Sequence, residues 1–274
     1  MIGREETVSI AGVPTYVLTV GQGPPLLIAH GGPGFDHGYL LRPMERLSRR
    51  RTLIHYDQPG CGRTPGPAGG VTAEATYRHF AALVDSLALP RLGILAHSWG
   101  GLVALGAAAL GMKRAVFDEG LLVTPVPTRK GPFDQVTLNL FARFPPDVMT
   151  RYPQLLEQRA EREAIELVLP YYFANPRPAP DIGLRVNLST FVGVFPHLGN
   201  FDFSGQLGLF KNCGVLLTEH DITTPDLVGD VLAATRQRFD LAGVGHFPGY
   251  EDPAGFARIL DAAFPDESGS HSST

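Results

Sequence analysis

The stretch from residue 92 to residue 110 constrains this chain more than any other. Leu92 to Leu95 is an apolar run that predicts a buried strand, and the Ala- and Leu-rich residues 102–110 predict a helix. Ser98 therefore stands at a strand-to-helix corner, where the turn lifts its hydroxyl above the sheet and the helix N-terminus favours a developing anion. The motif for a nucleophile at such a corner is Gly-x-Ser-x-Gly, with Ala96 here replacing the first glycine. The same position also suits a serine that only caps the helix.

The composition is that of a globular protein and argues against several functional classes. The 274 residues are 44% hydrophobic and 18% charged, which is enough for a sizeable core and too apolar for extensive disorder. A net charge of −4 without a basic stripe argues against a nucleic-acid partner. Because no apolar run approaches the ~18 residues of a membrane span and no secretory signal is visible, we expect a cytoplasmic protein without a membrane partner. Two cysteines are too few for a disulfide framework.

Strands and helices alternate through residue 120, which predicts parallel β-α-β units. The predicted strands in this part are 7–10 and 15–20 (an opening hairpin), 26–29, 52–56, 92–95 and 114–117, and the predicted helices are 39–49, 72–89 and 102–110. The alternation resumes with a strand at 214–218, a helix at 225–234, a strand at 239–241 and a helix at 253–264.

Residues 125–203 break this alternation. Three helical segments, 133–144, 147–173 and 184–194, follow one another there with Pro-rich turns between them. We therefore predict a helical cap at 125–203 inserted into a core made of 1–124 and 204–266, with a mobile Ser-rich tail at 267–274. Most cap aromatics should pack between cap and core, but some, with Phe141 and Tyr172 as candidates, should line a substrate pocket.

The strand at 26–29 runs into a cluster of one histidine, three glycines and a proline, His30-Gly31-Gly32-Pro33-Gly34. Glycine and proline break helices and strands, so the cluster predicts a tight loop whose bare N–H groups can face an anion. We expect the N–H groups of Gly32 and Trp99 to form an oxyanion hole. His30 and Gly31 are candidates for contact with the substrate.

A serine hydroxyl becomes a nucleophile only when a base takes its proton and a third group orients that base. His246 follows the last predicted strand in a Gly-x-Gly-His turn, which can project the imidazole across the strand ends. Asp221 comes just after the strand before it, where a carboxylate can orient the histidine. Asp118 or Glu119, which follow the strand expected at 114–117, are the alternative acids.

Three motifs in chain order resemble the proline iminopeptidase family of α/β-hydrolases. They are the cluster from His30 to Gly34, the segment Tyr56-Asp57-Gln58-Pro59-Gly60-Cys61-Gly62-Arg63-Thr64, and His97-Ser98-Trp99-Gly100-Gly101. Asp221 and His246 fall where that family's acid and base would. The resemblance implies an α/β-hydrolase fold with a mostly parallel sheet, a cap that shapes substrate choice, and no metal or organic cofactor. It also places Cys61 near the site, which predicts sensitivity to thiol reagents.

The function predicted from these residues is a serine hydrolase that cleaves an amide or ester bond of a small substrate through an acyl-enzyme. By the resemblance, the activity would be release of an N-terminal residue, such as proline, from short peptides. Aminopeptidases of this family resemble one another in binding the substrate amine with carboxylates late in the cap. Because no glutamate occurs between Glu166 and Glu219, the earlier Glu157 and Glu161 are the candidates here.

Other readings of the same residues stay open. An esterase, a lactonase or a C–C hydrolase would use the same three residues, Ser98, Asp221 and His246. A non-catalytic ligand-binding relative would have the fold without the activity. The expected partner is a small-molecule or short-peptide substrate. The sequence allows a monomer or a homo-oligomer.

Overall fold

The computed structural model describes residues 3–67, 69–176, 180–195 and 198–266, and its centre is a sheet of eight strands in the order β1-β2-β4-β3-β5-β6-β7-β8. The opening hairpin lies at one edge: β1 pairs antiparallel with β2, and β2 pairs antiparallel with β4. All the pairings from β4 across to β8 are parallel. The strands are β1 (Arg4–Ile10), β2 (Val13–Val20), β3 (Pro25–Ala29), β4 (Thr52–Tyr56), β5 (Gly93–His97), β6 (Gly120–Val123), β7 (Cys213–Thr218) and β8 (Gln237–Leu241).

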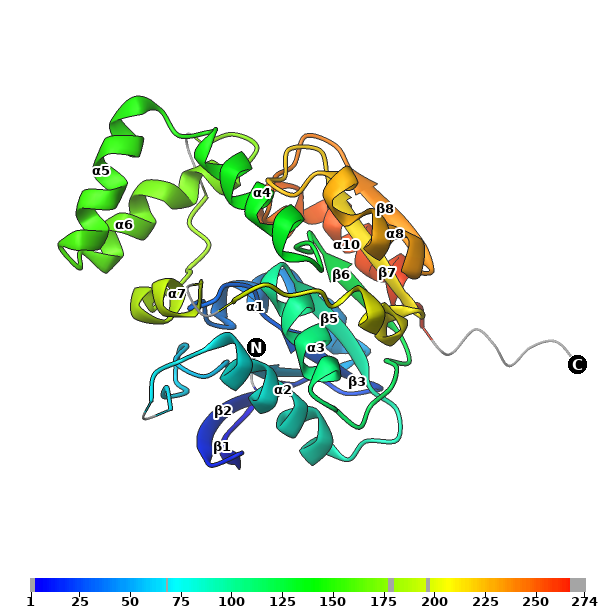
Figure 1. Ribbon diagram of the computed structural model, residues 1–274. Coiled ribbons are helices and arrows are strands. Elements are labelled where there is room, and N and C mark those ends of the chain that lie inside the picture. Colours follow the sequence, from blue (N-terminus) through cyan, green and yellow to red (C-terminus); the bar gives the residue numbers. More distant parts are fainter. Residues whose placement is uncertain (1–2, 68, 177–179, 196–197, 267–274) are drawn as a thin grey trace, which may run out of the picture.

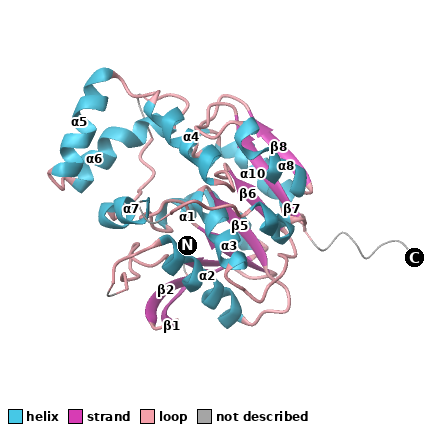
Figure 2. Ribbon diagram, in the orientation of Figure 1, coloured by secondary structure: helices cyan, strands magenta, loops and turns pink. Residues whose placement is uncertain are grey.

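Helices cover both faces of the sheet (Figures 1 and 2). Successive side chains of a strand point to opposite faces, so Leu27 and Ala29 pack with α2 (Ala73–Leu87), α3 (Trp99–Ala109) and α8 (Gly229–Ala234). Leu26 and Ile28 pack on the other face with α1 (Gly38–Met44) and α10 (Pro253–Ala263). The short α9 (Pro248–Glu251) precedes α10. Within the described residues, no helix is both long enough and apolar enough to cross a membrane. The mostly parallel sheet flanked by helices confirms the predicted fold class.

The predicted strand at 114–117 is wrong, because the strand between β5 and β7 is β6, a few residues later. All four residues of β6 are buried, as a central parallel strand with covered faces requires. Phe117 instead lies outside the sheet and stacks on Phe210, with ring centroids 6.3 Å apart. The shift moves Asp118 and Glu119 to the start of β6, at the edge opposite the carboxyl ends of the strands.

Among the described residues between β6 and β7, four α-helices lie beside the carboxyl ends of the strands (Figure 1). They are α4 (Lys130–Phe141), α5 (Pro146–Glu157), α6 (Glu161–Val168) and α7 (Leu188–Val194). The single helix predicted at 147–173 is broken, because Arg159 adopts a left-handed φ of 54° between α5 and α6, and the segment ends in a 3₁₀ turn, Leu169–Tyr172. The exact boundaries of the cap stay a prediction, and the predicted tail at 267–274 lies outside the described residues.

Candidate active site

Ser98 is the single residue between β5 and α3, as the motif predicts. Its φ of 51° and ψ of −120° are sparsely populated for a residue with a side chain, which costs about 1–3 kcal/mol. Helix α3 can approach the end of β3 this closely because Gly100 has no Cβ, which would collide with the carbonyl oxygen of Ala29. Ala96 is fully buried in the core beside α3, so its methyl group is accommodated. The Ser98 hydroxyl makes no capping hydrogen bond, which disfavours a purely helix-capping role.

The glycine-rich loop after β3 lies beside this corner. Gly32 has a φ of 128°, and a Cβ there would lie 3.0 Å from the backbone nitrogens of Gly34 and Phe35, so glycine is required. Trp99 begins α3, and its backbone N–H is therefore one of the donors without a partner inside the helix. Gly32, Ser98, Trp99 and His246 all line one small cavity of about 60 Å³. The structure thus brings both predicted oxyanion donors and the predicted base to the serine.

The predicted acid and base meet on the loops after β7 and β8. His246 Nδ1 lies 2.7 Å from Asp221 Oδ1, and both residues are buried. The same carboxylate oxygen accepts a hydrogen bond of 2.6 Å from the backbone N–H of Ile222. A carboxylate accepts but cannot donate, so Nδ1 carries the proton and Nε2 is the basic nitrogen of the ring. This is the tautomer that a histidine needs to take a proton from a serine hydroxyl.

The alternative acids are engaged elsewhere. Asp118 Oδ2 accepts a 2.8 Å hydrogen bond from the backbone N–H of Leu92, and Glu119 forms an ion pair with Arg51 at 3.0 Å. Both precede β6, so neither lies on a loop that follows a strand into the site. Of the three carboxylates considered from the sequence, Asp221 is the one that contacts His246.

A buried chain of hydrogen bonds connects the oxyanion loop, the corner and the base. The Gly31 N–H donates to the Tyr39 hydroxyl at 2.7 Å, and that hydroxyl donates to His97 Nδ1, also at 2.7 Å. His97 Nε2 then donates to the carbonyl oxygen of His246 at 2.9 Å. Burial and the neighbouring His246 hold the pKa of His97 well below its ordinary value, so the ring stays neutral and keeps this tautomer. Nothing in the sequence around Tyr39 indicates this role.

The loop that carries His246 is organised by Glu251, which sequence reasoning missed. Its Oε2 accepts hydrogen bonds from the backbone N–H groups of Gly245 at 3.0 Å and Ala174 at 2.8 Å, and its Oε1 accepts one from Phe247 at 3.3 Å. A Cβ on Gly245 would lie 2.6 Å from Ala174 N, so the glycine before the histidine allows this close approach.

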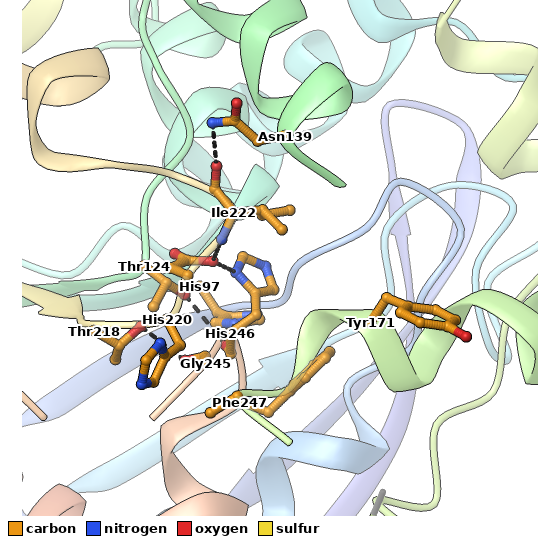
Figure 3. Close-up of polar contacts among 12 residues, drawn as sticks. His97, Thr124, Asn139, Tyr171, Thr218, His220, Ile222, Gly245, His246 and Phe247 are labelled. Atoms are coloured by element: carbon orange, nitrogen blue, oxygen red, sulfur yellow. Dashed lines mark hydrogen bonds and ion pairs between the residues drawn. The ribbon is translucent and has the colours of Figure 1, made fainter. Parts of the chain in front are cut away.

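Helix α4 and the turn after it hold the loop that carries Asp221. Arg143, just after α4, donates to the carbonyl oxygens of His220 at 2.8 Å and Asp221 at 2.6 Å. Asn139 of α4 donates to the carbonyl oxygen of Ile222 at 2.9 Å (Figure 3). Burial lowers the pKa of Arg143, although the nearby Asp221 carboxylate opposes that effect. These two side chains also had no signal in the sequence.

A second, larger cavity of about 580 Å³ lies among α4, α5, α6 and α7, and we call it the cap cavity. Phe141 lines it, and Tyr172 lines both the cap cavity and the small cavity at Ser98, so the structure places both predicted aromatics at a pocket. Glu157 is exposed on α5 and is not part of either lining. Glu161 begins α6, and its side chain lies outside the described part of the structure.

His30 and Gly31 support the oxyanion loop from within and do not line either cavity. His30 is fully buried, its Nδ1 donates to the Gly31 carbonyl oxygen at 2.7 Å, and its Nε2 accepts from the Gln58 N–H at 3.0 Å. Burial lowers the pKa of His30 to about 4, so the ring is neutral at pH 7. Contact of His30 and Gly31 with a substrate stays a prediction.

The fold and the site define a class: hydrolases with a candidate nucleophile on a sharp strand-to-helix corner and an acid–base pair on later strand-end loops. The chain belongs to the alpha/beta hydrolase family, whose model matches residues 26–259.

The curated relatives agree with the resemblance predicted from the motifs. The chain is 37% identical over 102 residues to a proline iminopeptidase of Lactobacillus helveticus, and 32% identical over 111 residues to one of Heyndrickxia coagulans. These matches cover 34% and 39% of this chain and 34% and 38% of the relatives, so the chain spans little more than a third of the relatives that it matches.

Solved structures match over nearly the whole chain. The proline iminopeptidase-related protein of Thermus thermophilus is 22% identical with a TM-score of 0.72, covering 96% of this chain and 97% of that one. The proline iminopeptidase of Mycobacterium smegmatis is 20% identical with a TM-score of 0.68, covering 94% and 97%. A haloalkane dehalogenase of Agrobacterium tumefaciens is 18% identical with a TM-score of 0.70, covering 95% of both chains. At these identities the neighbours show the fold, and they share it across different named activities.

Proposed function

We propose that this protein is a serine hydrolase that cleaves an ester or amide bond of a small substrate through an acyl-enzyme on Ser98. The observation that carries the proposal is the buried contact of 2.7 Å between His246 Nδ1 and Asp221 Oδ1. His246, the candidate base, lines the same cavity as Ser98, Gly32 and Trp99. These are the parts that acyl transfer needs: nucleophile, oriented base and oxyanion donors.

The mechanism follows from these positions. His246 Nε2 takes the hydroxyl proton while Ser98 Oγ bonds to the acyl carbon, and Asp221 stabilises the imidazolium that forms. The N–H groups of Gly32 and Trp99 hold the tetrahedral oxyanion, and one such donor is worth about 3 kcal/mol. The carbon–heteroatom bond then breaks, and the leaving group departs with the proton from His246. Water repeats the sequence in the second half, so the acid product leaves and Ser98 regains its proton.

Three other readings were open from the sequence. Release of an N-terminal proline is supported by the motif resemblance and by the curated relatives' names, but the one described carboxylate in the linings of the two cavities, Asp134, is paired with Lys130. C–C bond cleavage or lactone opening would use the same three residues, but no feature of the site favours either. A non-catalytic relative is disfavoured, since nucleophile, base and acid are all present.

The test is labelling by a fluorophosphonate, which reacts with activated serines. We expect the wild type to be labelled and to hydrolyse p-nitrophenyl acetate, and the Ser98→Ala variant to do neither while unfolding cooperatively in urea. Asp221→Asn should lower kcat by about 10⁴, because the histidine then adopts the wrong tautomer. Hydrolysis that survives in Ser98→Ala would sink the proposal.

A further inference from the structure

The cap cavity adjoins the small cavity at Ser98. Phe35, Thr137, Leu140, Tyr172 and Phe191 are among the residues that line both, so the two spaces share walls. Its volume of about 580 Å³ falls within the range typical of small-molecule sites, roughly 300–1,000 Å³. A substrate with its scissile carbonyl at Ser98 therefore has room for a bulky group under the cap.

The walls of the cap cavity are predominantly apolar. Phenylalanine, leucine, isoleucine and valine side chains from four helices make most of them, including Phe141, Leu156 and Ile165. The Tyr172 hydroxyl stays protonated, because burial raises the pKa of that residue. Such walls gain free energy by covering apolar surface, and the two charged residues among the described lining, Lys130 and Asp134, are paired with each other.

The described part of the lining offers no free carboxylate for a substrate amine. Asp134 is the one acidic residue among the described residues that line either cavity. Lys130, one helical turn before it, holds both carboxylate oxygens of Asp134 at 2.6 Å. The charge of this acid is therefore already matched from within α4.

Exposed apolar residues lie where the cap cavity opens. The structure describes five large hydrophobic residues as exposed, and two of them, Leu138 (56%) and Val192 (40%), line the cap cavity. Exposed apolar surface that borders a pocket is typical of a site that receives an apolar ligand.

We propose that the substrate is an ester or amide with a bulky, uncharged apolar group that occupies the cap cavity, rather than a compound with a free amine at that end. The proposal rests on the serine hydrolase function argued above and adds the substrate class. It predicts a preference opposite to that of an enzyme that releases N-terminal residues.

The first experiment compares p-nitrophenyl esters that differ only in the acyl group. From acetate to hexanoate, kcat/KM should rise about fourfold for each methylene that enters the cap cavity. A parallel series of acetate esters with lengthening alkyl alcohols covers the other side of the scissile bond. The heptanoate ester should exceed the isosteric 6-aminohexanoate ester at least about tenfold, because the walls leave an ammonium unpaired. A steady rise in either series, together with that preference, supports the proposal.

A filled cavity provides the second test. Ile165 lines the cap cavity but not the small cavity at Ser98, so Ile165→Trp should lower the ratio of hexanoate to acetate kcat/KM at least about tenfold. Met149→Trp is the matched control, because Met149 is an exposed apolar residue of α5 outside both linings. That variant should keep the wild-type ratio.

The possible outcomes distinguish a failure of the proposed substrate class from a failure of the proposed serine hydrolase function. If Ser98 is labelled and the acetate ester is hydrolysed, but neither series rises or the aminohexanoate ester is preferred, the substrate class is wrong and the hydrolase function stands. An unchanged ratio in Ile165→Trp would equally overturn the assignment of the cap cavity. If Ser98 is not labelled and no ester is cleaved, both proposals fall.

Discussion

The backbone at Ser98 predicts that the serine is held there at a cost in stability. A φ of 51° with a ψ of −120° costs a residue with a side chain about 1–3 kcal/mol, whereas glycine reaches positive φ freely. Ser98→Gly should remove that strain. Ser98→Ala is the control, because it removes the hydroxyl but keeps the Cβ that causes the strain.

The magnitude follows from two opposing terms. Relief of strain stabilises Ser98→Gly by about 1–3 kcal/mol, while the greater freedom of glycine in the unfolded chain offsets about 0.5–1 kcal/mol. Loss of the hydroxyl costs little in either variant, because it makes no capping hydrogen bond with α3. We therefore expect Ser98→Gly to be about 1 kcal/mol more stable than Ser98→Ala, with both variants inactive.

Urea unfolding measures this difference directly. The urea midpoint should be higher for Ser98→Gly than for Ser98→Ala, with the same m-value. If unfolding is reversible, the Tm of Ser98→Gly should be about 2–4 °C higher. Glycine at an unstrained site is less stable than alanine by about 0.5–1 kcal/mol. That opposite order, if measured here, would refute the argument that the corner is strained.

Three further predictions concern buried groups around the site. Tyr39→Phe removes the hydroxyl that joins the oxyanion loop to the corner, so we expect a loss of about 2–4 kcal/mol in urea unfolding and a fall in kcat that exceeds any change in KM. The folded pKa values of His30 (about 4) and His55 (about 3) lie below the unfolded value near 6.5, so the unfolded chain binds protons first as pH falls. The contribution of these two histidines to the free energy of unfolding should therefore be fully present at pH 7 and be lost from about pH 6.5 toward pH 4, by about 2 kcal/mol per histidine at pH 5. In the His55→Leu variant, the free energy of unfolding should fall less steeply over this pH range. Cys61 is buried, and burial raises the pKa of its thiol. Contrary to the sensitivity expected from the sequence, Ellman's reagent should therefore modify Cys61 only when the protein unfolds. Rapid labelling of the native protein would contradict this.

The parts of the site that could be predicted from the sequence are those fixed by local geometry. Gly32 and Ser98 each follow a short apolar strand, and His246 follows the last strand of the sheet in a glycine-rich turn. Parallel strands bring their carboxyl ends to one edge of a sheet. Asp221 was identified for the same reason. Chain order and strand ends were enough to predict that Ser98, Gly32 and His246 meet at one cavity and that Asp221 lies beside His246.

The mistaken strand shows where such reasoning stops. The apolar residues before Gly120 and those after it both suit a short buried strand by pattern. Pairing with β5 and β7 selects the later run, because a six-residue slip would leave Leu121 and Leu122 outside the core. Asp118 was a candidate acid only if the strand was the earlier run, so the position of the strand also excludes Asp118 as the acid.

The supporting contacts were beyond prediction because they join residues far apart in the chain. Tyr39 reaches His97, and Glu251 reaches Ala174, through packing that no local pattern encodes. The cap cavity likewise depends on how four helices pack against one another. Early cap acids such as Glu157 looked suitable for an amine by composition, but the helix turns that side chain outward.

In the proposed hydrolase, the helices between β6 and β7 position the candidate acid and line the proposed substrate cavity through different side chains. Arg143 and Asn139 hold the loop of the candidate acid by its backbone carbonyl oxygens, so they fix its position whatever the rest of the cap contains. The residues that face the cap cavity, such as Phe141 and Ile165, make no such contact with that loop in the described hydrogen bonds. Ile165 packs in a different apolar cluster from Ile222, so substitutions of Ile165 should change the group that is admitted without moving Asp221 or His246. Cap helices can therefore diverge in substrate while the chemistry at Ser98 is retained, which is why a resemblance carried by core motifs identifies the reaction better than the substrate.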